Sequence, residues 1–429
     1  MNRLSKRRPA FSRQRGVSFI IALAAMALVV TVVAVYAQNQ TVAFKAVVAR
    51  NETRKAEAAA MAGVQRAMAE LQAVVDATDQ PVTLEDDWAT FGNNGAEEFM
   101  MGQDSFRIQI IDNAARIDLN TVTQDHLANL NLTQEQIDSF LDWRDVAVDS
   151  RPEGAKDDYY NRLAKPYNAH ENQLQSVYEI LDIKGFTPQN VFFPVDNTSS
   201  TAASSAVSDL ALIELITTQN FSAARTPEGD GRVNVNNPQL NAQNFAQQAQ
   251  IPIQSAQQII AQRATQPNAT YTALSQVLSV PGVANNQAVV RSVLDRMTVS
   301  PGEQLSGKIN VNTAPEAVLQ TIPGISQDQA TQMVDSRPTG GYTQLSELLS
   351  IAADQAFAGA VADRLNVNSQ CFQVRVLGKS GQTEYGIEAL VQIDQGVMKV
   401  LRIERPPYAN LATQWLWDEA TTQTTLLEN

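Results

Sequence analysis

The sequence predicts an α+β fold in which one long N-terminal helix packs on an antiparallel sheet and a large helical insertion interrupts that sheet. Three observations lead to this prediction. The chain opens with an apolar stretch that continues into an amphipathic one, strand-like segments lie at both ends of the remaining sequence, and a short motif recurs three times between them.

The first 37 residues predict a membrane anchor with a cleavable leader. The residues before Val17 include six Lys or Arg and no acid, and the almost wholly apolar residues 17–37 span about 31 Å as a helix. The basic head is expected to stay in the cytoplasm. Because Gly16 precedes the apolar run, cleavage between Gly16 and Val17 would leave the anchor attached. The pattern resembles a prepilin-type leader; an uncleaved signal anchor is the alternative.

Residues 38–76 predict that the helix continues beyond the membrane. They contain no proline, are rich in alanine and place apolar residues near helical spacing. At the fifth residue after the cleavage site, where major pilins and most pseudopilins have a glutamate, this chain has Ile21. A glutamate in lipid needs a partner charge, understood in such filaments to be a neighbour's amino terminus. A subunit with Ile21 cannot make that pairing in the usual way.

Strand-like segments bracket the helix-rich middle of the chain. Residues 106–111 alternate in polarity before an Asp-Asn turn, and residues 372–376, 386–393 and 397–403 predict a three-stranded meander. Antiparallel strands on a long N-terminal helix form a pilin-like unit. The helical middle is therefore predicted to be an insertion between the first strand and the last three.

A short β-like motif occurs three times in the insertion, and each copy is followed by a predicted pair of short helices. The copies begin at Arg116, Arg232 and Lys308, and their second helices carry Arg144, Arg263 and Arg337. Tyr271 and Tyr342 follow in the later copies, with Tyr167 as a looser equivalent in the first. Capping-box patterns pair Thr121 with Gln124, Thr133 with Gln136, Thr313 with Glu316 and Ser326 with Gln329. Units this small bury little apolar surface on their own, so the copies are expected to pack together or on the rest of the domain.

Composition narrows the possible functions. The formal net charge is −13, and loss of the six positive charges of the leader would make it −19, which disfavours nucleic acid as a partner. The single cysteine, Cys371, excludes an intramolecular disulfide. Two histidines, His126 and His170, offer little material for a zinc site or a histidine-based triad. No Walker-type loop or nucleophile elbow occurs, so catalysis is not expected.

The first copy differs from the others by an acidic stretch that follows Arg144. Hard carboxylate oxygens on a flexible loop suit Ca²⁺, although the spacing here is not that of an EF-hand. A solvated acidic loop without a metal is the alternative. The candidate ligands are Asp145, Asp149, Glu153, Asp157 and Asp158.

The leader junction without a glutamate, residues 106–120 and the stretches 143–145, 153–160, 165–167 and 176–179 resemble the minor pseudopilin K family of type II secretion, GspK. The resemblance implies a pilin-like fold with a helix-hairpin-helix or SAM-like insertion and two calcium ions in the inserted domain. It also implies an N-methylated mature terminus after cleavage by prepilin peptidase, a single-pass anchor in the inner membrane with the C-terminal domain in the periplasm, and a place at the pseudopilus tip with minor pseudopilins I and J. Ala147 and Lys156 stand where the family has acidic residues.

The predicted organisation has five parts: the leader 1–16, the transmembrane helix 17–37, a first pilin-like part 38–120, an inserted helical domain 121–366 with a linker at about 196–206, and a second pilin-like part 367–429. Two other functional classes share features with the chain. A minor pilin of a type IV pilus would have the same anchor and leader. The third copy of the motif also resembles the helix-hairpin-helix module of ComEA-type DNA receptors, but the Gly-x-Gly hairpin that grips phosphate is missing.

Overall fold

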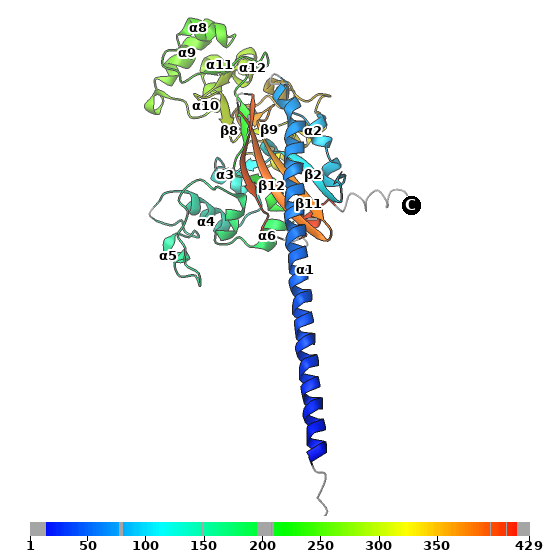
Figure 1. Cartoon of the computed structure of the whole chain (residues 1–429). Coiled ribbons are helices and arrows are strands. Elements are labelled where there is room, and N and C mark those ends of the chain that lie inside the picture. The colour runs from blue at the N-terminus through cyan, green and yellow to red at the C-terminus, as the bar shows by residue number, and fades with distance from the viewer. Residues whose placement is uncertain are drawn as a thin grey trace, which may run out of the picture.

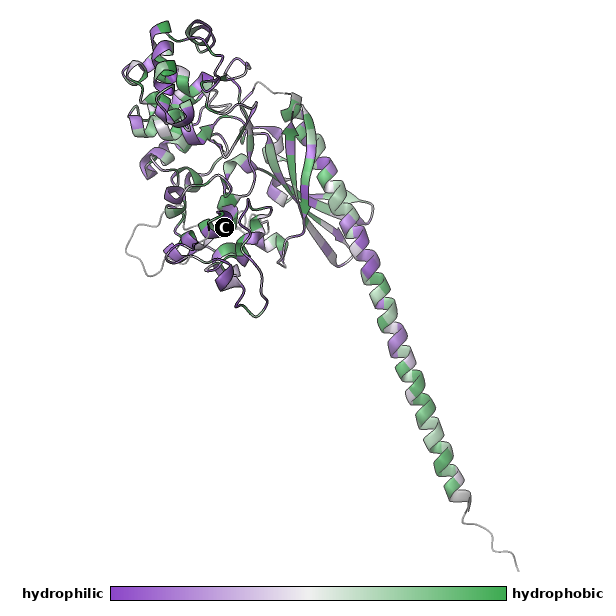
Figure 2. Ribbon diagram, turned by 90° about the vertical axis from the view of Figure 1, so that its left-hand side faces the viewer, coloured by the Kyte–Doolittle hydropathy of each residue, from purple (hydrophilic) through white to green (hydrophobic). Residues whose placement is uncertain are grey.

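The computed structural model describes residues 14–76, 80–147, 149–194, 207, 210–394, 396–408 and 410–417. Residues 1–13 of the predicted leader and the predicted linker at 196–206 lie outside the described residues. The long helix α1 (Gln14–Asp76) projects from a head in which the sheet and the helical insertion lie side by side (Figure 1). Hydrophobic residues dominate the projecting half of this helix (Figure 2).

The C-terminal half of α1 packs on a five-stranded antiparallel sheet, in the strand order β1-β2-β11-β12-β13. Its contact stripe consists of residues spaced three or four apart and fully buried: Ala56, Ala60, Val64, Ala67 and Leu71. Glycine allows a close approach on the sheet side, because a Cβ at Gly378 would lie 2.1 Å from the Ala56 carbonyl oxygen. The helix and sheet therefore share one core, which includes Ile108, Val374 and Ala389.

The sheet and its accessory elements come from both ends of the chain. The elements are α2 (Asp87–Thr90), η1 (Asn93–Gly95), β1 (Glu98–Met101), β2 (Asp104–Asp112), η2 (Asn113–Ala115), β11 (Cys371–Ser380), β12 (Thr383–Asp394), β13 (Val397–Glu404) and α16 (Leu411–Gln414). Strand β2 pairs with β11 although more than 250 residues separate them, as in the register Val374 with Ile110. The four predicted strands are thus β2, β11, β12 and β13, each extended by a few residues at most at either end.

The insertion consists of three modules of the same design, each opened and closed by a two-residue strand. In every module these strands pair in parallel: β3 (Ile117–Asp118) with β4 (Ile216–Thr217), β6 (Val233–Asn234) with β7 (Met297–Thr298), and β9 (Ile309–Asn310) with β10 (Leu365–Asn366). The first module thus begins at Ile117, slightly before the predicted boundary at 121. The strand pair β5 (Phe221–Ala223) and β8 (Gln304–Ser306) links the chain before and after the second module.

Short helices fill each module between its strands. The first contains α3 (Gln124–Ala128), α4 (Gln134–Arg144), α5 (Asp157–Tyr160), η3 (Val177–Asp182), α6 (Pro188–Phe192) and α7 (Leu212–Leu215). The second contains α8 (Ala242–Gln248), α9 (Ile253–Arg263), η5 (Pro267–Ala269), α10 (Leu274–Leu278), α11 (Pro281–Ala284) and α12 (Gln287–Arg296). The third contains α13 (Glu316–Leu319), α14 (Gln327–Asp335), η6 (Leu345–Ser350) and α15 (Gln355–Arg364). All three contribute to one continuous hydrophobic core, so the expectation that the copies pack together is correct.

One asparagine closes each module with the same hydrogen bonds. The side chain of Asn312 accepts from the Tyr342 N–H at 2.7 Å and donates to the carbonyls of Tyr342 and Val367 at 3.0 and 3.1 Å. Asn236 binds Tyr271 and Val299 in the same way. The first-module counterpart, Asn120, binds Leu174 and Thr218. Leu174, and not the predicted Tyr167, is therefore the equivalent of the two tyrosines.

Candidate functional site

The projecting half of α1 is the first candidate functional element. Among the described residues it is the one helix long and apolar enough to cross a membrane, and none of its most apolar window is buried in the protein. The proposed cleavage point between Gly16 and Val17 lies within this helix. Ile21 is 62% exposed on the same segment, so its side chain is presented to the surroundings of the helix and not to the head.

The acidic stretch of the first module is the second candidate element, and it begins where α4 ends. Asp138, Asp142 and Asp145 follow one another at helical spacing, which places three carboxylates on one side of α4 and its C-cap. A glycine is required opposite them, because a Cβ at Gly154 would lie 1.9 Å from Asp142 Oδ2. The acidic loop therefore folds back onto the end of α4.

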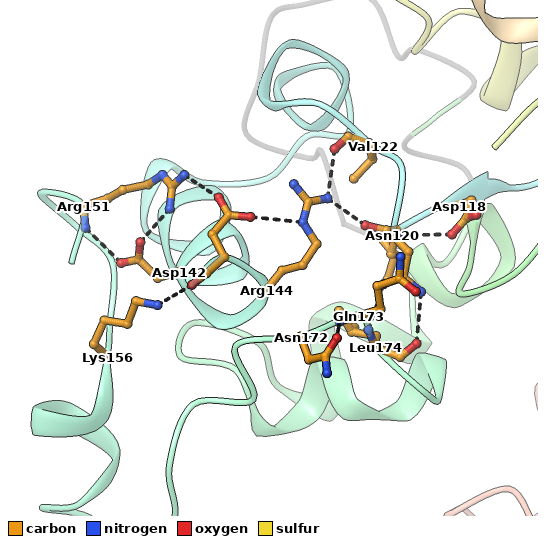
Figure 3. A network of polar contacts seen from close by, with 12 residues as sticks. Asp118, Asn120, Val122, Asp142, Arg144, Arg151, Lys156, Asn172, Gln173 and Leu174 are labelled. Atoms are coloured by element: carbon orange, nitrogen blue, oxygen red, sulfur yellow. Dashed lines mark hydrogen bonds and ion pairs between the residues drawn. The ribbon is translucent and has the colours of Figure 1, made fainter. Parts of the chain in front are cut away.

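Two cations hold this loop against α4 (Figure 3). Arg151 bridges two carboxylates, with Nη1 2.7 Å from Asp142 Oδ1 and Nη2 2.8 Å from Asp145 Oδ2. Lys156 donates to the Asp145 carbonyl at 2.5 Å and to Glu171 Oε1 at 3.0 Å. Although partial burial alone would raise the pKa of Asp145, the hydrogen bond from Arg151 and the charge of Arg144 hold that pKa below its ordinary value.

The five predicted calcium ligands do not come together around a common point. Asp145 is paired with arginines, and Asp157 accepts a hydrogen bond from the Ala169 N–H at 2.8 Å. Asp158 is exposed and lies 3.8 Å from Arg162, one helical turn away. Asp149 and Glu153 are exposed. Within the described residues no group of three or more His, Cys, Asp or Glu side chains is placed to hold a metal ion.

Behind the loop, an aromatic cluster fixes its position. Trp143 packs edge-on to Tyr160, with 5.2 Å between ring centroids, and Tyr160 stacks on Tyr167 at the same distance. Tyr160 is fully buried, and burial raises its pKa to about 12. The phenol therefore stays neutral at physiological pH and acts as a packing group.

Arginine anchors tie the beginning of each module to the end of its second helix, although Arg337 lies just beyond α14 and not on the helix as predicted. Arg144 donates to the carbonyls of Leu119 and Val122, each at 3.0 Å (Figure 3). Arg263 donates to Val235 and Asn237 at 2.8 Å, and Arg337 to Val311 and Ala314. These guanidinium groups, which the repeat pattern had marked, thus bind backbone carbonyls within their own modules.

Sequence reasoning missed the partners of the acidic residues. The sequence pattern does not indicate Asp142, Arg151 or Glu171, and it shows Lys156 only as a departure from the family pattern. The helical spacing of Asp138, Asp142 and Asp145 is the signal that could have identified the carboxylate side of the cluster. No pattern in the sequence indicates that Glu171 returns to Lys156, because an irregular loop joins them.

The long helix, the antiparallel sheet and the apolar projecting segment together define a pilin-like protein with a helical insertion. Residues 112–191 and residues 309–368 each match a family model described as type II secretion system (T2SS), protein K. The chain belongs to this protein K family and is a minor pseudopilin of the type II secretion system. Neither a type IV pilus subunit nor a competence DNA receptor is favoured by these matches.

Among solved structures, the chain is similar to one in "The Crystal Structure of the GspK-GspI-GspJ complex from enterotoxigenic Escherichia coli Type 2 Secretion System". The two share 13% sequence identity with a TM-score of 0.49, over 84% of this chain and 98% of that chain. No curated protein matches the chain in sequence.

Proposed function

We propose that this minor pseudopilin caps the tip of the type II secretion pseudopilus, and so serves as a structural component in the export of folded proteins across the outer membrane. Ile21, an exposed apolar side chain in the segment of α1 that would lie in lipid, supports the proposal. A major subunit uses a glutamate there to neutralise a neighbour's amino terminus, and an unpaired charge in lipid is costly. A subunit without that carboxylate is suited to the end of a filament.

The position of the modules is the observation that carries the proposal, because it does not depend on the residue at position 21. In Figure 1 the second module rises beyond the C-terminal end of α1, on the side away from the projecting anchor. A further subunit stacked on that side would meet α8 and α9 of the second module. The second module would therefore obstruct another copy of the chain stacked on that side.

The remaining features of the proposal follow from family membership and from the anchor. We propose that prepilin peptidase cleaves between Gly16 and Val17, that the new terminus is N-methylated, and that α1 spans the inner membrane once with the head in the periplasm. Minor pseudopilins I and J are the proposed partners, by analogy with the solved GspK-GspI-GspJ complex. The proposed role needs neither nucleic acid nor catalysis.

Counting copies in sheared filaments tests the capping role. Wild-type protein and an Ile21→Glu variant are both expected at a single copy per filament, because the head forbids incorporation along the shaft even when the carboxylate is restored. Secretion should stay nearly intact in the variant. Ile21→Gln, which changes polarity without adding charge, is the matched control. Either protein found at many copies along the shaft would refute the proposal.

Co-purification of the full-length chain from detergent-solubilised membranes tests the partners. Minor pseudopilins I and J are expected to be retained with the tagged chain, and the major pseudopilin only through them. Retention of the major pseudopilin in cells that lack I and J would contradict a tip position reached through those two subunits.

A further inference from the structure

Lys156 occupies a cation position inside the acidic loop. Its side chain is 7% exposed, and its ammonium lies within hydrogen-bond distance of two oxygens from different parts of the loop, the Asp145 carbonyl and Glu171 Oε1. A calcium ion binds oxygens at about 2.3–2.6 Å and would need the same two oxygens and several more. The ammonium and a calcium ion cannot both be accommodated there.

Arg151 occupies the neighbouring position. Its guanidinium lies between Asp142, whose side chain is fully buried, and Asp145, and its own N–H donates to Asp142 Oδ2 at 2.9 Å. Both carboxylate oxygens of Asp142 therefore accept a hydrogen bond from Arg151, Oδ1 from the guanidinium and Oδ2 from the backbone N–H. The buried carboxylate thus has no oxygen left without a donor that a metal ion could use.

Three carboxylates of the cluster have cationic partners, whereas Asp138, on the same side of α4, accepts a hydrogen bond from the Glu153 N–H at 3.2 Å. The contacting carboxylates are Asp142, Asp145 and Glu171, and the contacting cations are Arg144, Arg151 and Lys156, three of each sign. Calcium affinity depends on the number of charged ligands, and these three carboxylates already have a cation each.

We propose that Lys156 and Arg151 take the place of a bound metal in this loop, so that the first module closes through its own side-chain cations and independently of calcium. This inference does not rest on the tip-capping role, because a subunit can cap a filament with or without a metal-dependent fold. It assigns Lys156 a defined role: one residue converts a loop that would need an external cation into one that carries its own.

Thermal unfolding of the full-length protein in detergent provides the first test. The melting temperature of the wild-type protein is expected to be the same in millimolar CaCl₂, in millimolar MgCl₂ and in EGTA. A rise in melting temperature that calcium alone produces and EGTA reverses would overturn the proposal.

Hydrogen exchange of the loop provides the second test, because it reports on the loop even if global stability hardly changes. Lys156→Met is expected to speed exchange in peptides from residues 149–171 by about tenfold, since it leaves polar groups of the closed loop without a donor. Calcium should not restore protection. Lys399→Met, which removes an exposed lysine from β13, is the matched control and should leave these peptides unchanged. Unchanged exchange in Lys156→Met would also overturn the proposal.

A gain of calcium dependence provides the third test. Lys156→Glu replaces the ammonium by a carboxylate and lowers the net charge of the cluster by two units. In EGTA the loop of this variant should exchange faster than in the wild type, and calcium, but not magnesium, should restore its protection. Failure of calcium to rescue the variant would show that Lys156 does not occupy a cation position. Because none of the readouts involves secretion or filaments, these results are independent of the capping role.

Discussion

Arg375 of β11 forms an ion pair with Glu214 of α7, with Nη2 2.7 Å from Oε1, and through Nε a second one with Glu388 on β12. Arg116 donates to the other oxygen of Glu214 at 2.8 Å. Burial alone would raise the pKa of Glu214, but the two guanidinium groups hold it below its ordinary value. This network joins the sheet to the first module at the face opposite α1.

Removing the central cation should therefore weaken the whole head. In Arg375→Met the aliphatic stem is kept, but Glu388 stays buried and loses its charged partner, so we expect the free energy of unfolding to fall by about 3–5 kcal/mol. Denaturant unfolding followed by tryptophan fluorescence measures this change. The control is Lys399→Met, which breaks an exposed pair with Asp394 and should cost at most about 1 kcal/mol. Equal losses of unfolding free energy in the two variants would contradict the role of Arg375 as the central cation of the network.

The module-closing asparagines give a second prediction. Asn312→Ala removes three hydrogen bonds at a buried site and leaves the carbonyls of Tyr342 and Val367 without this donor. We expect a loss of roughly 3 kcal/mol, because each unsatisfied buried group costs on the order of 1–3 kcal/mol. Asn244→Ala, at an exposed position of α8, should change stability by less than about 0.5 kcal/mol. Thermal unfolding of the two variants measures this difference. Similar melting midpoints would argue against the proposal that the asparagine closes each module through its hydrogen bonds.

Local signals predicted most of the elements but not all of their caps. The capping boxes of Thr133 with Gln136 and of Ser326 with Gln329 are present. The box at Thr313 is wrong, because the Thr313 hydroxyl donates to Asp112 of the sheet at 2.5 Å and α13 begins later. The box at Thr121 is wrong because the cap residue of α3 is Thr123. At Thr313 the cap fails because a tertiary partner binds the hydroxyl, whereas the Thr121 hydroxyl donates locally to the Asp118 carbonyl.

The candidate site was predicted less completely than the fold, for a related reason. Acidic residues are visible in any sequence, whereas the cations that neutralise them depend on how the loop folds. Arg151 reaches Asp142 and Asp145 from nine and six residues away, and Lys156 reaches Glu171 across fifteen. No helical or strand periodicity connects these pairs, so only the folded loop reveals that the acids are paired.

The contact between the first and third modules is expected to be sensitive to pH. His126 is 2% exposed, and its Nε2 lies 2.9 Å from the Thr321 hydroxyl, which itself donates to the Val318 carbonyl. Because the Thr321 hydrogen is used in that bond, Nε2 of His126 is the donor to the Thr321 oxygen. Burial, together with the charge of Arg364, lowers the pKa of His126 from 6.5 to about 4.

The sign of the effect follows from linkage. The unfolded chain binds a proton near pH 6.5 and the folded chain only near pH 4, so the stability that neutral His126 provides is present above pH 6.5 and is lost as the pH falls toward 4. The loss is on the order of 3 kcal/mol for a shift of this size. His126→Gln, which can still donate to Thr321 but does not titrate, should lose less stability over this interval. Parallel curves of unfolding free energy against pH for the wild type and His126→Gln would show that protonation of His126 does not cause the loss of stability.

Gly154 is expected to be intolerant of even one methyl group. A Cβ there would lie 1.9 Å from Asp142 Oδ2 and 3.2 Å from the Asp138 carbonyl oxygen, so Gly154→Ala must push the loop away from α4. We expect a loss of about 1–3 kcal/mol, as for other overpacked sites, together with faster hydrogen exchange in the loop. Gly231→Ala is the matched control, since a Cβ at Gly231 meets nothing within 4 Å. If both variants behave alike, the close approach of Gly154 to Asp142 is not what holds the loop.

The last prediction concerns the mature terminus. Protein extracted from membranes should begin at Val17, because cleavage after Gly16 keeps the apolar segment of α1 that anchors the chain. Gly16→Ile should block this step, since a bulky side chain at the position before the cut obstructs the peptidase, and the unprocessed chain should retain its six leader charges. Mass spectrometry of the intact protein and N-terminal sequencing distinguish the two forms. Ser18→Ala lies on the other side of the cut and is the control that should still be processed. A wild-type chain that begins at Met1, or at a residue beyond Ala37, would show that the segment is an uncleaved anchor or an ordinary secretory signal.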